Sequence, residues 1–145
     1  MDILFLILLA LLGGIAVTLQ GQFMGVMDQS IGTRESVFIT YAGGGLVITL
    51  LMLFLRGGNL RAAASVPWYA FSAGLLGLLI VGTIGFTVPR LGLTSALTLV
   101  LAGQYIASVV IERFGWFGAP VRPFEWTRAL GIFLLLFGVW LTTRK

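Results

Sequence analysis

Long apolar stretches alternate along this chain with short polar segments that hold nearly all of its charge. A helix needs about 20 apolar residues to cross the hydrocarbon core of a bilayer. The pattern therefore predicts five transmembrane helices, over residues 3–27, 34–55, 67–88, 91–112 and 126–143. The last needs Trp126, Thr127 and Arg128 to reach the length of a span, because its uncharged run covers only 129–143. We expect an all-α bundle that forms a single transmembrane domain over residues 1–145.

Helices are favoured over a β-barrel because transmembrane strands need only about 10 residues of alternating character. The runs here are longer and apolar on all sides. The first run could be mistaken for a signal peptide. No Lys or Arg precedes it, however, and its apolar character continues past any cleavage point, so we expect a retained first helix.

Composition supports the membrane assignment and narrows the chemistry. Hydrophobic residues make up 59% and charged residues 10%, whereas about a quarter of a soluble protein is charged. The chain has no cysteine or histidine, which excludes disulfides, an imidazole base and the usual zinc sites. We therefore expect no enzyme, metal or cofactor. The net charge of +4 comes from dispersed residues, so we expect anionic lipid headgroups as the counter-charge, and no nucleic acid.

The positive charges give almost no bias between the two sides of the membrane. On the side of the carboxyl terminus the connections carry Arg34, Arg90, Arg144 and Lys145, and on the other side they carry Arg56, Arg61, Arg113, Arg122 and Arg128. A difference of one residue does not fix the topology. Two interpretations remain: a single orientation, or insertion in both orientations as an antiparallel pair. Many transporters have two halves of inverted topology, which two such chains would supply.

Polar side chains follow one face of the fourth predicted helix. At about 100° per residue, this face holds Thr94, Thr98, Tyr105, Ser108 and Glu112, with Gln104 beside it. An uncompensated polar group in hydrocarbon costs several kcal/mol, so the face should meet a cavity or another helix. Both alternatives stay open for Gln104. The candidate substrate-binding residues are Gln20, Gln104, Tyr105, Ser108, Ser72 and Tyr41.

Other residues are expected to act at helix ends or in packing. Glu112 and its neighbour Arg113 are candidates for a gate or an ion pair, Asp28 is expected to be solvated, and Thr33 is expected to cap the second helix. Small residues let helices approach closely. The candidate packing residues are Gly14, Gly21, Gly25, Gly131 and Gly138, and Gly43 to Gly45 suit packing or bending.

Several segments resemble a known family. They are Leu19-Gln20, Val88-Pro89-Arg90-Leu91-Gly92, Ala102-Gly103-Gln104, Glu112-Arg113-Phe114-Gly115-Trp116-Phe117-Gly118, Gly131 and Gly138-Val139. They are similar to the YdcZ-type family, a five-helix branch of the drug/metabolite transporter superfamily. The chain departs from it at Met24, where the family often has Asn, and at Glu112, where Asp is usual.

The resemblance implies a fold of two inverted five-helix repeats, of which this chain is one half, around a cavity lined by helices one, three and four. It implies a secondary transporter in the cell inner membrane, or plasma membrane, that crosses the bilayer several times. Such a protein moves small metabolites or drug-like solutes by alternating access. The partner is a second, antiparallel copy or a homologous five-helix chain. The alternative function is a non-transporting subunit that stabilises or regulates another membrane protein.

Overall fold

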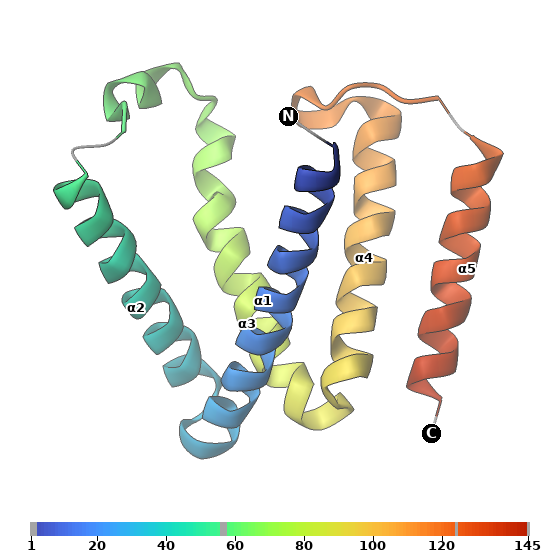
Figure 1. Ribbon diagram of the computed structural model, residues 1–145, viewed down its shortest axis with the longest axis horizontal. Helices are drawn as coiled ribbons and strands as arrows, with labels where there is room; N and C mark the ends of the chain where they lie inside the picture. Colours follow the sequence, from blue (N-terminus) through green and yellow to red (C-terminus); the bar gives the residue numbers. More distant parts are fainter. Residues whose placement is uncertain (1–2, 56–57, 124, 145) are drawn as a thin grey trace. The chain divides into compact units, whose positions relative to one another are not determined.

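The computed structural model describes residues 3–55, 58–123 and 125–144, and every regular element within them is helical (Figure 1). The long helices are α1 (Ile3–Ile31), α2 (Thr33–Phe54), α3 (Ala73–Leu91), α4 (Leu93–Phe114) and α5 (Trp126–Thr143). Short 3-10 turns are η1 (Leu60–Ser65), η2 (Trp68–Ser72) and η3 (Trp116–Gly118). Five spans are long and apolar enough to cross a membrane, and η2 extends the third to Trp68–Leu91. The predicted all-α fold with five membrane-spanning helices is confirmed.

The connections after the first and third helices are shorter than expected. α1 continues to Ile31, and Gly32 alone separates it from α2. Gly32 has a φ of 97°, a conformation that glycine adopts without steric cost. Gly32 also occupies the position before α2 where Thr33 was expected to cap the helix, so that expectation was wrong. α3 likewise continues through Pro89, and the next helix begins after Gly92.

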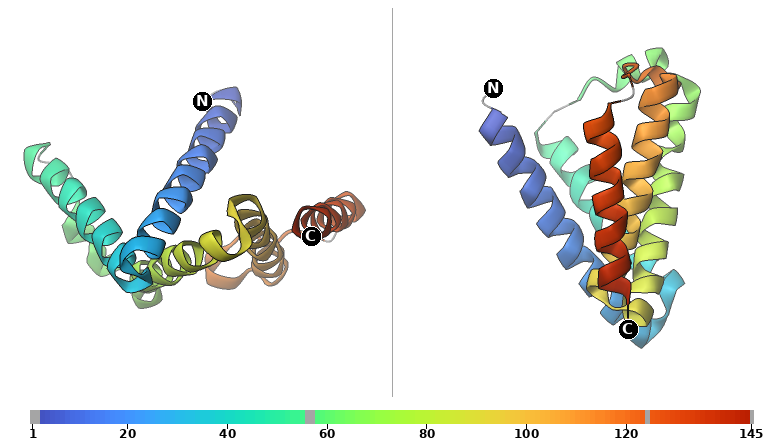
Figure 2. Two further views of the ribbon diagram at one scale, coloured as in Figure 1. Left: turned by 90° about the horizontal axis from the view of Figure 1, so that it is seen from below. Right: turned by 90° about the vertical axis from the view of Figure 1, so that its right-hand side faces the viewer.

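The chain forms two compact units, and the first reaches Arg90. In this unit α1 and α2 diverge from the end that they share at Gly32 (Figures 1 and 2). Near that end α3 packs closely against both helices, because Gly85 leaves room for Met24 of α1 and Ser36 of α2. Met24 and Ser36 are fully buried there.

The second unit begins at Leu91 and consists of α4, η3 and α5. α4 and α5 pack side by side and run antiparallel. At one end the Ser95 hydroxyl donates a hydrogen bond to the Thr142 carbonyl at 3.2 Å. At the other end Glu112 of α4 meets Arg128 of α5. Ala96 and Ala102 of α4 and Val139 of α5 are the buried apolar residues of this unit among those described.

Most of the apolar surface is not covered by the chain itself. Among the described residues, the buried apolar side chains are Met24, Ile84, Val88, Ala96, Ala102 and Val139. Large side chains such as Phe5, Phe38 and Phe133 are more than half exposed. Exposure of so much apolar surface to water would be energetically unfavourable. These helix faces therefore meet lipid tails or other helices.

Candidate functional site

An open groove runs between the diverging helices α1 and α2 of the first unit. Gln20, Thr40, Tyr41, Gly44 and Ile48 line it, together with Gly45 and Val81, and its volume is about 360 Å³. A second groove of about 410 Å³ adjoins it and shares Gln20 and Thr40. Both volumes lie in the range of small-molecule sites.

The glycines of α2 widen this groove. A side chain added at Gly43, Gly44 or Gly45 would meet no atom within 4 Å. Any close packing at these glycines therefore needs a helix from outside the chain, and both packing and bending stay predictions. Their missing side chains leave a shallow wall next to Gln20 and Tyr41.

The groove lining contains no charged residue. The Gln20 side chain is exposed, and within the described part of the chain its amide has no hydrogen-bond partner. The Thr40 hydroxyl donates to the Ser36 carbonyl at 2.8 Å, which leaves its oxygen free to accept. An amide, a hydroxyl and a phenol among apolar walls suit a solute that is largely apolar and carries a few hydrogen-bonding groups.

Tyr41 fills space that Gly77 of α3 leaves open because glycine has no side chain. A Cβ atom at Gly77 would overlap the Tyr41 hydroxyl. The ring of Tyr41 therefore crosses from α2 toward α3 and is half-buried. Gly77 thus determines where the phenol stands at the edge of the groove.

Of the six predicted substrate-binding residues, Gln20 and Tyr41 line this groove together. Ser72 lies just before α3, where its hydroxyl donates to the Tyr69 carbonyl at 2.6 Å. Gln104, Tyr105 and Ser108 lie within about one turn of α4, in the second unit, and all three are exposed. The Ser108 hydroxyl donates to the Gln104 carbonyl at 2.8 Å, whereas the Gln104 amide has no partner within the described residues.

Asp28 is enclosed at the end where α1, α2 and α3 meet, contrary to the solvated position expected for it. Its side chain is only 4% exposed and lies 2.9 Å from the guanidinium of Arg90 on α3. The Thr33 hydroxyl of α2 donates to its other carboxylate oxygen. The Arg90 guanidinium also stacks on the Phe86 ring, 3.6 Å from its centroid. One carboxylate therefore joins all three helices of the first unit.

Glu112 forms its ion pair with a different arginine from the expected one. Its carboxylate lies 2.7 Å from the guanidinium of Arg128, at the start of α5. Both side chains are about a quarter exposed. Within the described residues Arg113 forms no ion pair, because consecutive helical residues point about 100° apart. The pair therefore joins α4 to α5.

The candidate packing glycines fall into two groups. Gly21 and Gly25 are buried, and a Cβ atom at Gly25 would lie 2.9 Å from Val88. Gly14, Gly131 and Gly138 have open space around them within this chain. Any close packing at these three positions therefore needs a helix from outside the chain.

The structure also adds residues that the sequence reasoning missed. Thr40 lines both grooves. The helical spacing of polar residues in the sequence did not single it out. The partnership of Asp28 with Arg90 did leave a trace in the sequence. Alternation of the five spans places both residues at the same membrane side, where opposite charges attract.

Comparison with known proteins agrees with this architecture. Residues 5–141 match the model of the family described as "Putative inner membrane exporter, YdcZ". The chain is also 24% identical over 135 residues to the "Inner membrane protein YdcZ" of Escherichia coli (strain K12), covering 91% of this chain and 90% of that protein. No solved structure matches the chain. Since the family model spans nearly all five helices, the chain belongs to the YdcZ family of inner membrane proteins.

Proposed function

We propose that the chain is one half of an exporter in the cell inner membrane, and that it moves small metabolites or drug-like solutes by alternating access. The family description and the name of the similar protein support export and the inner membrane. The groove of the first unit supplies the solute site in this proposal, with Gln20, Thr40 and Tyr41 as its polar contacts. Gln104, Tyr105, Ser108 and Ser72 contribute further solute contacts.

One observation carries this proposal: the unpartnered Gln20 amide in an uncharged groove. An amide without a partner in hydrocarbon costs several kcal/mol. Gln20 is the eighteenth residue of the 29-residue helix α1, well inside the span. Water or solute in the groove would satisfy the amide and remove that cost. A groove filled by lipid tails would offer the amide no hydrogen-bond partner.

We propose that the other half is a second copy in the opposite orientation. The odd number of spans and the nearly even charge distribution support this arrangement. The uncovered space at Gly14, Gly131 and Gly138 offers places for close contact with another helix. A homologous five-helix partner would use the same surfaces.

Single cysteines test whether the groove holds water, because the chain has no cysteine of its own. Thr40→Cys should react with a membrane-impermeant maleimide in vesicles. Leu46→Cys is the matched control, since it lies about 200° around α2 from the groove residue Gly44, and it should stay unlabelled. An unreactive Thr40→Cys would contradict the solute cavity and favour a subunit whose groove is filled by a partner helix.

A cysteine at the exposed residue Asn59, in the connection between the second and third spans, tests the orientation. If the chain inserts both ways, about half of the Asn59→Cys molecules should react from each side of the membrane. Arg144→Cys, at the other end of the spans, should give the complementary labelling. Labelling of Asn59→Cys from one side only would rule out the antiparallel homodimer and require a separate partner of opposite topology.

A further inference from the structure

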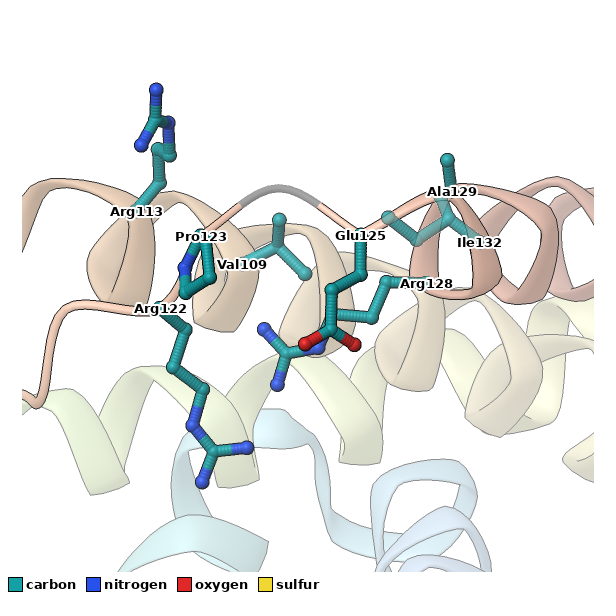
Figure 3. Close-up of a pocket in the computed structure, with 8 residues that line it drawn as sticks. All are labelled: Val109, Arg113, Arg122, Pro123, Glu125, Arg128, Ala129 and Ile132. Atoms are coloured by element: carbon teal, nitrogen blue, oxygen red, sulfur yellow. The ribbon is translucent and has the colours of Figure 1, made fainter.

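The second unit contains a small basic pocket at the end of α4 and the start of α5 (Figure 3). It shares no lining residue with the groove of the first unit. Its charged lining residues are Arg113, Arg122, Arg128 and Glu125, and its volume is about 120 Å³. That volume equals the share of roughly four water molecules in the liquid. It is too small for a drug-sized solute but large enough for a compact anionic group.

The loop after α4 places Arg122 beside the end of that helix. Gly115 ends α4 with a φ of 65°, and a Cβ atom there would lie 2.7 Å from Val121. The chain therefore folds back, and the backbone N–H of Arg122 donates to the Glu112 carbonyl at 3.1 Å. This backbone bond positions Arg122 without using its guanidinium.

The positive charges of the pocket are only partly compensated. Arg128 pairs with Glu112, and Glu125 is the acid among the lining residues. Within the described residues the guanidinium of Arg122 has no carboxylate partner. It extends to the same side of the loop as Arg128, whereas Arg113 points to the opposite side. The start of α5 adds the partial positive charge of a helix N-terminus.

The rest of the lining is apolar. Val109, Ala129 and Ile132 lie on the helix side of the pocket and lead from its basic mouth toward the middle of the spans. Trp116 and Trp126 are exposed at this end of the unit, as is typical of residues at headgroup depth. A free inorganic anion would interact only with the basic side of the pocket. A phospholipid would contact both sides, its phosphate meeting the arginines and the beginning of its acyl chains meeting the apolar residues.

We propose that this pocket binds the phosphate of an anionic phospholipid, with Arg122 as its main contact and Arg128 as support. The acyl chains of the lipid then follow Val109 and Ile132 along the two helices. Such a lipid would fix the loop after α4 and the start of α5 at the membrane surface. The site does not depend on export activity or on a second copy of the chain.

Native mass spectrometry of the purified full chain tests this proposal, with equimolar phosphatidylglycerol and phosphatidylcholine added in detergent. The wild type should retain phosphatidylglycerol preferentially. An arginine near a membrane surface contributes enough attraction that Arg122→Gln should lower this preference roughly fivefold. The substitution Arg122→Gln does not alter the backbone hydrogen bond to the Glu112 carbonyl, so the loop should keep its fold. Thermal unfolding of the variant can verify this.

Arg34→Gln is the matched control, because it removes the same charge from an exposed arginine that does not line this pocket. It should keep the preference within about twofold of the wild type. Equal losses in both variants would show diffuse attraction and overturn the site. Absence of any preference in the wild type would also overturn it. Displacement of phosphatidylglycerol by millimolar inorganic phosphate would assign the pocket to free anions instead of lipid.

Discussion

Asp28–Arg90 and Glu112–Arg128 are ion pairs that join neighbouring helices, but they differ in how far the acid is enclosed. The Asp28 side chain is 4% exposed and has a second partner in Thr33. The Glu112 side chain is 28% exposed, and its partner Arg128 borders an open basic pocket. The first pair therefore belongs to the packing of three helices, whereas the second leaves positive charge accessible at the membrane surface. Charged residues at two similar helix ends thus serve different purposes.

The difference in burial predicts a large effect when Asp28 loses its counter-charge. Arg90→Ala should lower the free energy of unfolding by about 3–5 kcal/mol, because it leaves a buried carboxylate unpaired. Arg34→Ala is the control, since Arg34 is exposed and forms no ion pair within the described residues. It should cost less than about 0.5 kcal/mol. Unfolding in mixed micelles with increasing dodecyl sulfate measures both, and equal losses would contradict the enclosed role of Asp28.

A smaller loss of stability is expected when a side chain is added at a closely packed glycine of the first unit, and almost none at an open glycine of the second. Gly85→Val should destabilise the chain by about 1–3 kcal/mol, since an added Cβ atom would lie 3.1 Å from Met24 and the larger side chain overfills the site. Gly103→Val on α4 places the same side chain in open space. We expect it to change the free energy of unfolding by less than about 0.5 kcal/mol. The same micelle titration applies, and a tolerated valine at position 85 would show that α3 does not approach α1 and α2 this closely.

The smallest effect is expected at the exposed ion pair. Glu112→Gln should lower the free energy of unfolding by less than about 1 kcal/mol, because partly exposed pairs gain little over solvated charges. The loss should shrink further at high salt, which screens such pairs. Thermal unfolding at low and high salt measures both. A salt-independent loss as large as that of Arg90→Ala would remove the distinction between the two pairs.

The sequence predicted the long helices because each span needs about 20 apolar residues, and this requirement is local to the segment. It placed the end of the first helix at residue 27, four residues before Ile31, because Asp28 was expected to be solvated at the helix end. In the structure Asp28 remains helical, and its charge is balanced by Arg90, 62 residues further along. Pro89 misled in a similar way. Its missing N–H suggests a turn, yet α3 extends two residues beyond it.

The candidate site was only partly accessible to the same reasoning. The isolated amide of Gln20 could be identified, because an uncompensated polar residue within an apolar run is costly wherever the helix packs. The position of Tyr41 beside it depends on the missing side chain of Gly77, on another helix. Helical spacing relates residues on one helix and carries no information about which faces of two helices meet.

The sequence by itself determined the membrane class, the all-α fold and the family, because hydrophobic run length and local motifs need no knowledge of packing. Only the tertiary structure decided which arginine each acid binds, which glycines allow close contact, and where the groove and the basic pocket lie. These features join residues from different helices, such as Glu112 and Arg128, which are 16 positions apart. Their proximity is set by how the helices pack, since an ion pair or a pocket depends on distances in space.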